Sequence, residues 1–131
     1  MKVLIVDDDF TSRLLLQELL KPHGDSHIAT NGREAVQAVR AAHERGEPYD
    51  LICLDIMMPE MDGHEALQEI RAEEAARQLP PIRAARILMT TALDDFASVR
   101  NSYYGLCDTY LVKPIRAAQL TDELRRMELI A

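Results

Sequence analysis

Residues 51–63 read LICLDIMMPEMDG, which is a short apolar run followed by an acid and then by turn residues. Its first four residues form a short apolar run, which predicts a buried strand. Pro59 and the pair Asp62-Gly63 indicate that a loop follows. Asp55 stands between the strand and the loop, and a carboxylate at the mouth of a buried strand is costly to keep ionised without a nearby cation. The stretch therefore predicts a strand that delivers an acid to a site shared with a cation.

Apolar runs on both sides of this strand alternate with stretches of helical periodicity. The other four runs cover residues 3–6, 28–30, 87–90 and 110–112. Each of the five runs is followed by a stretch with apolar residues on one helical face: Leu15, Leu16, Leu19 and Leu20; Ala35, Val36, Val39 and Ala42; Ala66, Leu67 and Ile70; Val99 and Tyr103; and Leu120, Leu124 and Met127. Five strands alternating with five helices predict an α/β fold, a single doubly wound parallel sheet with helices on both faces. Residues 75–86 have the weakest pattern and are predicted to form an extended, basic loop.

Composition and charge limit the kinds of protein that this can be. The chain has 131 residues, 47% of them hydrophobic, which predicts one globular domain over residues 1–131. Its formal net charge of −7 argues against a nucleic-acid partner and against a membrane surface. Cys53 and Cys107 are far apart in the sequence, which favours a reducing compartment. The sequence has no apolar segment of the length of a signal peptide or a membrane span, so a cytoplasmic location is expected.

Polar side chains follow four of the five predicted strands at the point where each strand ends. They are Asp7 and Asp8 after the first strand, Asp55 after the third, Thr90 and Thr91 after the fourth, and Lys113 after the fifth. In a doubly wound sheet, ligands bind outside the carboxyl ends of the strands. These residues are scattered along the sequence, so a common site explains them better than a run of solvated charges does.

This mixture of groups indicates a particular chemistry. Clustered carboxylates suit Mg²⁺, which prefers oxygen ligands. A magnesium ion, a lysine and a hydroxyl together neutralise and orient a phosphoryl group, and an aspartate can accept that group as an aspartyl-phosphate. Taken one at a time, the residues have ordinary explanations: Asp7 or Asp8 could be a helix N-cap, Thr91 a strand-end residue and Lys113 a surface lysine. Their convergence at four strand ends favours a phosphoryl site.

Five motifs, in order, resemble the receiver domain of bacterial two-component response regulators, in particular the chemotaxis regulators. They are VLIVDDD, ATNGREA, DLICLDIMMPEMDG, ILMTTA and YLVKPI. The resemblance covers about residues 2–130, which is nearly the whole chain. It implies a flavodoxin-like sheet with the strand order 2-1-3-4-5, and a chain that acts in phosphorelay signalling.

The resemblance also implies a role for each acid of the site. Asp55 matches the phosphoacceptor of the family. Asp8 matches the direct Mg²⁺ ligand, and Asp7 matches an acid that acts on the ion largely through water. The backbone carbonyl of Met57 would supply a further metal ligand. Asp9 fits the third place of the acidic triplet, where no role is required.

Further positions match the family's switch. Thr91 resembles the switch hydroxyl, Lys113 the partner of the phosphoryl group, and Tyr110 the switch aromatic residue. The peptide bond between Lys113 and Pro114 is expected to be cis. A change at this switch would alter a face that binds a downstream protein, whose identity is unknown.

The partners and the activity are likewise implied by the resemblance. The phosphoryl donor would be a histidine on a sensor histidine kinase or on a histidine phosphotransfer protein. The chain would not be an enzyme in the ordinary sense, but a phosphoacceptor that promotes its own phosphorylation and its slow dephosphorylation. The tail at residues 127–131 is expected to fold back onto the domain, which favours a stand-alone receiver over a piece of a longer chain.

Two alternative functions fit part of the sequence. A haloacid-dehalogenase-type phosphatase would use Asp7 as its nucleophile, because residues 7–11 superficially fit the Asp-x-Asp motif of those enzymes. However, the acid pair Asp94-Asp95 precedes Lys113 instead of following it, and the glycine expected after the second acid of the motif is missing. The other alternative is a degenerate receiver that acts only as an unphosphorylated docking scaffold.

Overall fold

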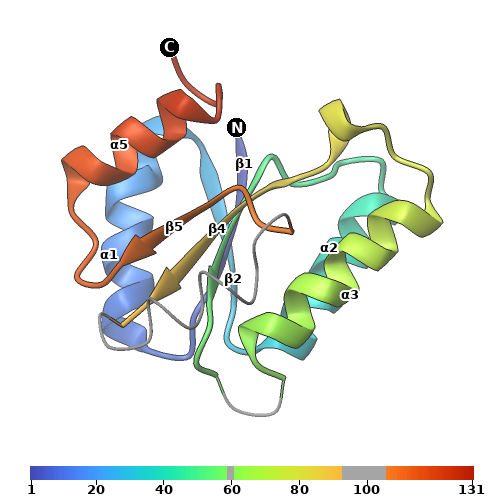
Figure 1. Ribbon diagram of the computed structural model, residues 1–131, viewed down its shortest axis with the longest axis horizontal. Coiled ribbons are helices and arrows are strands. Elements are labelled where there is room, and N and C mark those ends of the chain that lie inside the picture. The colour runs from blue at the N-terminus through green and yellow to red at the C-terminus, as the bar shows by residue number, and fades with distance from the viewer. Residues whose placement is uncertain (59–60, 93–105) are drawn as a thin grey trace.

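Five parallel strands form a single sheet in the order β2-β1-β3-β4-β5 (Figure 1). The computed structural model of the protein describes residues 1–58, 61–92 and 106–131. The strands are β1 (Lys2–Val6), β2 (Asp25–Ala29), β3 (Leu51–Asp55), β4 (Arg86–Thr91) and β5 (Thr109–Val112). Every neighbouring pair is parallel. The predicted doubly wound sheet and its strand order are therefore confirmed.

Helices cover both faces of the sheet, as Figure 1 shows. They are α1 (Phe10–Leu20), α2 (Gly32–Glu44), α3 (Gly63–Ala76) and α5 (Ala117–Arg126), with short 3₁₀ turns at Lys21–His23 and Pro81–Arg83. The pair α2 and α3 packs on one face, and the pair α1 and α5 packs on the other. The helix predicted around Val99 and Tyr103 lies outside the described residues. Within the described part of the chain, none of the helices combines the length and the apolarity needed to cross a bilayer.

Alternation along the strands divides the core into two clusters. Successive side chains of a strand point to opposite faces of the sheet. In β3, Ile52 and Leu54 therefore pack under α2 and α3, whereas Leu51 and Cys53 pack under α1 and α5. All five residues of this central strand are buried, as expected for a sheet that is covered on both sides. By the same alternation, Asp55 leaves the strand on the α1/α5 face.

Two expectations about the first half of the chain were wrong in detail. Leu16 and Leu20 of α1 are buried, but Leu15 is 40% exposed. Consecutive residues of a helix are turned by about 100° around its axis, so Leu15 does not share the buried face of Leu16. The second strand covers Asp25–Ala29 and not residues 28–30. Its boundaries follow backbone pairing with β1, from Lys2 opposite Asp25 to Val6 opposite Ala29, and not hydrophobicity.

The stretch at residues 75–86 is more ordered than the sequence predicts. Helix α3 continues to Ala76, and a 3₁₀ turn occupies Pro81–Arg83. Glu74 is buried, and its carboxylate accepts hydrogen bonds from the Arg71 guanidinium at 2.7 Å and from the Ala85 backbone N–H at 2.7 Å. This buried, paired acid holds the segment against the start of β4.

At the other end of the chain, Leu129 and Ile130 pack against the α1/α5 cluster, so the predicted return of the tail is confirmed.

Candidate functional site

The carboxyl ends of four strands bring their polar residues to one edge of the sheet. The ammonium of Lys113, which follows β5, lies 3.0 Å from Oδ2 of Asp7 and 3.5 Å from Oδ1 of Asp55. Asp7, Asp8 and Asp55 each offer a carboxylate oxygen, and these three atoms lie within 4.8 Å of one another. Asp7 is fully buried and Asp55 is 5% exposed, whereas Asp8 faces solvent. The predicted convergence of acids and lysine is therefore confirmed.

The turn between β1 and α1 depends on Asp9, whose role the sequence analysis missed. Asp9 is the N-cap of α1, and its Oδ2 accepts the backbone N–H of Ser12 at 2.9 Å. The Asp9 N–H in turn donates to Oδ1 of Asp7 at 2.9 Å. The suggestion that Asp7 or Asp8 caps the helix was wrong. The missed signal is the position of Asp9 directly before the first helical residue, where an acid is a favoured cap.

The loop after β3 folds back tightly because of Gly63. A Cβ atom at this position would lie 2.5 Å from the backbone oxygen of Asp55 and 2.7 Å from Cα of Ile56. The Gly63 N–H also donates to the Ile56 backbone oxygen at 2.9 Å. Asp62 caps α3 by accepting the Glu65 N–H at 3.0 Å. A glycine is therefore required here for α3 to begin against the end of the strand that carries Asp55. Pro59 and Glu60, between these two points, lie outside the described residues.

The electrostatics of the site are dominated by its excess of acids. Burial, and then the neighbouring Asp7 carboxylate, raises the pKa of Asp55 to about 6. Burial by itself would lower the pKa of Lys113, but its hydrogen bond to Asp7 and the attraction of Asp55 raise it. One ammonium therefore faces three carboxylates. Such a cluster of oxygen donors fits a hard divalent cation such as Mg²⁺.

As the pH rises from about 4 to about 6, the metal-free protein is expected to lose stability because of Asp55. In this window the folded chain keeps a proton on a carboxyl whose pKa is about 6, whereas the unfolded chain has released it. The loss is about 1–3 kcal/mol at about 1.4 kcal/mol per pKa unit. Asp55→Asn removes the titrating group, so its stability advantage over wild type should grow across this window and then stay constant.

Urea unfolding near pH 4.5 and near pH 7.5, in the presence of a chelator, measures this advantage. Asp122→Asn, which changes an exposed acid, is the control. If Asp55→Asn were more stable than wild type by the same amount at both pH values, the raised pKa of Asp55 would be contradicted.

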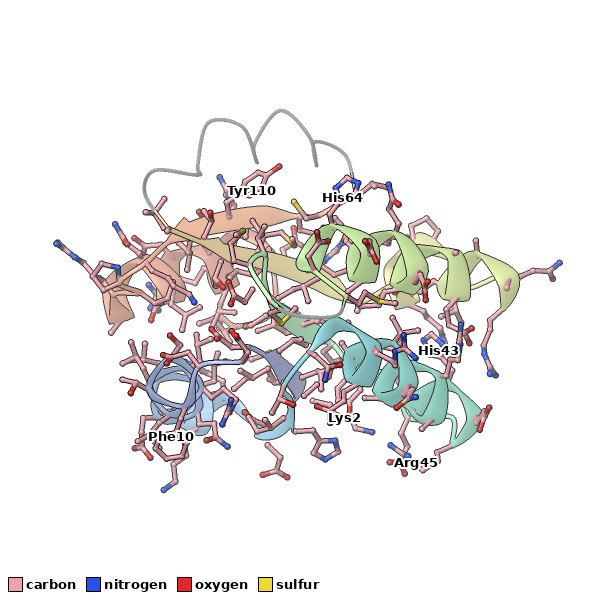
Figure 2. All side chains as sticks on the ribbon, turned by 90° about the horizontal axis from the view of Figure 1, so that it is seen from below. Lys2, Phe10, His43, Arg45, His64 and Tyr110 are labelled. Carbon is pink, nitrogen blue, oxygen red and sulfur yellow. The ribbon has the colours of Figure 1, made fainter. Side chains whose placement is uncertain are left out.

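The expected switch residues lie on β4 and β5, with Thr91 at the end of its strand and Tyr110 near the start of its own. Thr91 is buried at the end of β4, and its hydroxyl donates to the Ala92 backbone oxygen at 3.2 Å. Tyr110 is half-buried on the side of the sheet that carries α3 (Figure 2). The Lys113–Pro114 peptide bond is cis, as expected. The side chain of Met57 is exposed, and the role of its carbonyl as a metal ligand stays a prediction.

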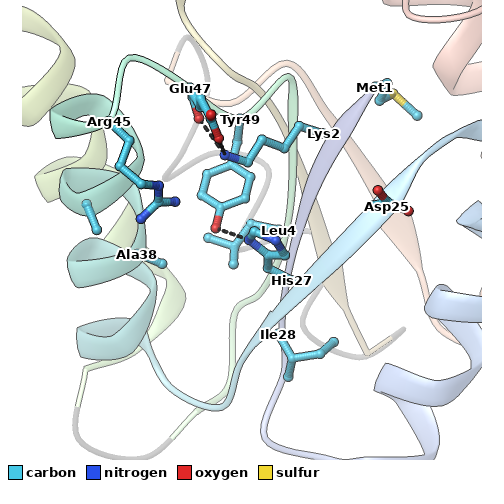
Figure 3. A pocket seen from close by; sticks show the side chains of 11 residues that line it. Met1, Lys2, Leu4, Asp25, His27, Ile28, Ala38, Arg45, Glu47 and Tyr49 are labelled. Carbon is cyan, nitrogen blue, oxygen red and sulfur yellow. Dashed lines mark hydrogen bonds and ion pairs between the residues drawn. The ribbon is translucent and has the colours of Figure 1, made fainter.

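A pocket of about 790 Å³ lies at the opposite end of the sheet, between β2 and α2 (Figure 3). There, Nδ1 of His27 lies 2.8 Å from the Tyr49 hydroxyl. The Lys2 ammonium donates to the Glu47 backbone oxygen at 2.7 Å and lies 5.1 Å from the centroid of the Tyr49 ring. These polar groups pair with one another, in contrast to the acids at the strand ends, which outnumber their lysine.

Comparisons with known proteins agree with this geometry. The sensor protein GacS of Pseudomonas syringae pv. syringae is 37% identical over 119 residues, which make up 91% of this chain and 12% of GacS. The chemotaxis protein CheY of Bacillus subtilis (strain 168) is 31% identical over 127 residues, which cover 95% of each chain. The chain thus spans about one-eighth of GacS but nearly all of CheY.

A solved structure shows the same fold. The crystal structure of the receiver domain of the histidine kinase CKI1 from Arabidopsis thaliana, complexed with Mg²⁺ and BeF₃⁻, superimposes with a TM-score of 0.82 at 30% identity. The match covers 97% of this chain and 89% of that one. The family model described as the response regulator receiver domain matches residues 3–125. The chain therefore belongs to the response regulator receiver domain family, the receivers of two-component phosphorelay systems.

Proposed function

We propose that the chain accepts a phosphoryl group on Asp55 in a Mg²⁺-dependent transfer. The donor is a histidine on a sensor histidine kinase or a histidine phosphotransfer protein. The observation that carries the proposal is the position of the Lys113 ammonium, 3.0 Å from Asp7 and 3.5 Å from Asp55, within a cluster of three carboxylates. Incubation with Mg²⁺ and acetyl phosphate tests it, and one acid- and base-labile phosphoryl group per chain is expected.

The hydrogen bonds favour Asp55 over Asp7 as the nucleophile. Both oxygens of Asp7 are engaged, Oδ1 by the Asp9 N–H at 2.9 Å and Oδ2 by Lys113 at 3.0 Å. Asp7 is also fully buried, whereas Asp55 retains some exposure at the end of β3. A nucleophile needs a lone pair that can reach the donor. This difference argues against the dehalogenase-type mechanism, in which Asp7 would attack.

The metal would be held by Asp8 and Asp55 directly, by Asp7 largely through water, and by the backbone carbonyl of Met57. The oxygen-only donor set of this cluster fits Mg²⁺, the ion that accompanies the CKI1 receiver domain in its crystal structure. When bound, the ion supplies charge neutralisation for the phosphoryl oxygens. Lys113 contributes a second positive charge at the same oxygens, and the Thr91 hydroxyl turns towards the new anion from the end of β4.

Asp8→Ala is expected to weaken Mg²⁺ binding by roughly tenfold or more, because it removes a direct carboxylate ligand. Asp9→Ala should change the affinity by no more than about twofold, because Asp9 caps α1 and does not belong to the carboxylate cluster. The Asp9 variant should instead lower the thermal midpoint through loss of the cap. Calorimetric titration with Mg²⁺ at fixed ionic strength compares the two variants. Equal losses of affinity would show that the metal site is misplaced.

Phosphorylation at Asp55 is proposed to change a face that binds a downstream protein. Thr91 and Tyr110 lie on the same side of the sheet. Thr91 is two residues after Met89 and therefore shares its face, and Met89 pairs with Tyr110 on β5. A shift of the Thr91 hydroxyl towards the phosphoryl group would therefore be transmitted to the packing of Tyr110.

The chain promotes its own phosphorylation and slow dephosphorylation through Lys113 and the metal. Neither Cys53 nor Cys107 is in a disulfide bond in the described part of the chain, which supports a cytoplasmic location.

A further inference from the structure

The hydroxyl of Thr90 is a buried polar group that the proposed mechanism does not use. Thr90 is 1% exposed, and its Oγ1 has no hydrogen-bond partner within the described part of the chain. Buried hydroxyls are nearly always paired, because an unpaired one costs the desolvation of the group. The buried Thr109 follows this rule, since its Oγ1 accepts from the Arg126 guanidinium at 2.8 Å. The unpaired Thr90 oxygen therefore requires an explanation.

Thr90 stands in the same row of the sheet as the proposed phosphoacceptor. In the register of the strands, Thr90 pairs with Asp55 on β3 and with Leu111 on β5. Paired residues of parallel strands share a face, and both Leu111 and Cys53 pack in the α1/α5 cluster. Thr90 therefore lies on the α1/α5 face, as Asp55 does, and it is the neighbour of Asp55 on the adjacent strand β4.

The Lys113 side chain has to pass across this row to reach the acids. Lys113 follows β5, Asp55 ends β3, and β4 lies between these two strands. The Lys113 ammonium lies 3.5 Å from Asp55 and 3.0 Å from Asp7, which follows β1, the strand beyond β3. The lysine therefore extends over the end of β4, where Thr90 is located, and makes its shorter contact with the more distant acid.

A cation on the carboxylate cluster would disturb this arrangement. A divalent ion on the cluster would repel the Lys113 ammonium, and a water bound to the ion would compete for the Asp7 oxygen that the ammonium contacts. The ammonium has three N–H donors and two carboxylate contacts, so withdrawal from Asp7 frees a donor for another acceptor. Withdrawal towards β5 leads back over β4, and Thr90 Oγ1 is an unpaired oxygen in that direction.

We propose that Thr90 is a positioning residue for Lys113. When a divalent cation occupies the carboxylate cluster, the Thr90 hydroxyl oxygen accepts a hydrogen bond from the Lys113 ammonium and holds it over Asp55. This inference rests on the proposed function for its consequence in phosphoryl transfer, but the step itself requires only the cation. Thr90 acts through Lys113 and does not touch the reacting atoms.

Three variants separate the hydroxyl from the shape of the side chain. Thr90→Val removes the hydroxyl at nearly constant volume, Thr90→Ser keeps it, and Thr109→Val removes a buried hydroxyl remote from the strand-end acids. Titration with Mg²⁺ alone should give a Kd about three- to tenfold higher for Thr90→Val, the equivalent of one lost hydrogen bond. Thr90→Ser and Thr109→Val should both stay within about twofold of wild type. With acetyl phosphate at saturating Mg²⁺, the maximal rate constant of phosphorylation should fall for Thr90→Val alone, with the half-saturating acetyl phosphate concentration unchanged.

The thermal midpoint of the metal-free protein shows that the variants are folded. Thr90→Val should raise the midpoint because it removes an unpaired buried hydroxyl, and Thr109→Val should lower it because it removes the hydrogen bond that Thr109 accepts from Arg126. Wild-type Mg²⁺ affinity and rate in Thr90→Val would overturn the proposal. An equal loss in Thr90→Ser would overturn it too, because shape would then be the cause. If wild-type protein takes up no phosphoryl group, the proposed function fails, while the Mg²⁺ titration still decides the role of Thr90.

Discussion

Asp55→Asn is expected to abolish the uptake of phosphoryl groups from acetyl phosphate, because the nucleophilic carboxylate is lost. The substitution keeps the size of the side chain and removes a charge that burial disfavours, as the raised pKa of about 6 indicates. The variant should therefore be folded and no less stable than wild type at neutral pH. Loss of labelling can then be assigned to the missing carboxylate and not to unfolding.

Two further variants complete this experiment. Asp25→Asn changes an exposed acid on β2, at the opposite end of the sheet from the carboxylate cluster, and should be labelled like wild type. Asp7→Asn should slow labelling, because it alters the metal site and removes the partner of Lys113. If Asp55→Asn were still labelled and Asp7→Asn were not, Asp7 would be the nucleophile, as in the dehalogenase-type mechanism.

Lys113→Met is expected to have the second large effect, on stability as well as on phosphorylation. The substitution leaves the buried carboxylates of Asp7 and Asp55 without their cation. Breaking a buried ion pair from one side costs about 3–5 kcal/mol, and the 28% exposure of the lysine side chain reduces this to about 2–4 kcal/mol. Phosphorylation should slow by about a hundredfold, as for other groups that stabilise developing charge.

Lys21→Met is the matched control, since the chain has only three lysines and Lys21 is exposed at the end of α1. It should change stability by no more than about 0.5 kcal/mol. Urea unfolding with and without Mg²⁺ makes the measurement specific. Because the ion replaces part of the missing positive charge, Mg²⁺ should stabilise Lys113→Met more than it stabilises wild type. A Lys113→Met protein as stable as Lys21→Met, with no extra response to Mg²⁺, would contradict the electrostatic description of the site.

The principal features of the site could be predicted because parallel strands impose a common direction. The hydrophobic runs locate where each strand ends, and all five ends of a parallel sheet point the same way. Asp7, Asp55 and Lys113 are therefore brought together by topology, although the first and last are 106 residues apart. A sequence pattern can show this convergence before any contact is known.

Other features depend on neighbours that no local pattern reveals. Glu74 occurs in a polar stretch, yet it is buried because Arg71 and the Ala85 N–H are brought against it by the packing of α3. The unpaired hydroxyl of Thr90 follows from its place between β3 and β5, which only the register shows. Asp9 was assigned no role because the family resemblance requires none at the third place of the acidic triplet, and the start of α1 at Phe10 makes Asp9 the cap.

Phosphorylation of Asp55 can be tested by locating the phosphoryl group in the wild-type chain. Protein incubated with acetyl phosphate and Mg²⁺ is reduced with borohydride, which converts a phosphorylated aspartate to homoserine, and is then digested and analysed by mass spectrometry. A single conversion is expected, at Asp55, and it should depend on Mg²⁺. Conversion at Asp7, or no conversion at any aspartate, would contradict the proposed phosphorylation of Asp55.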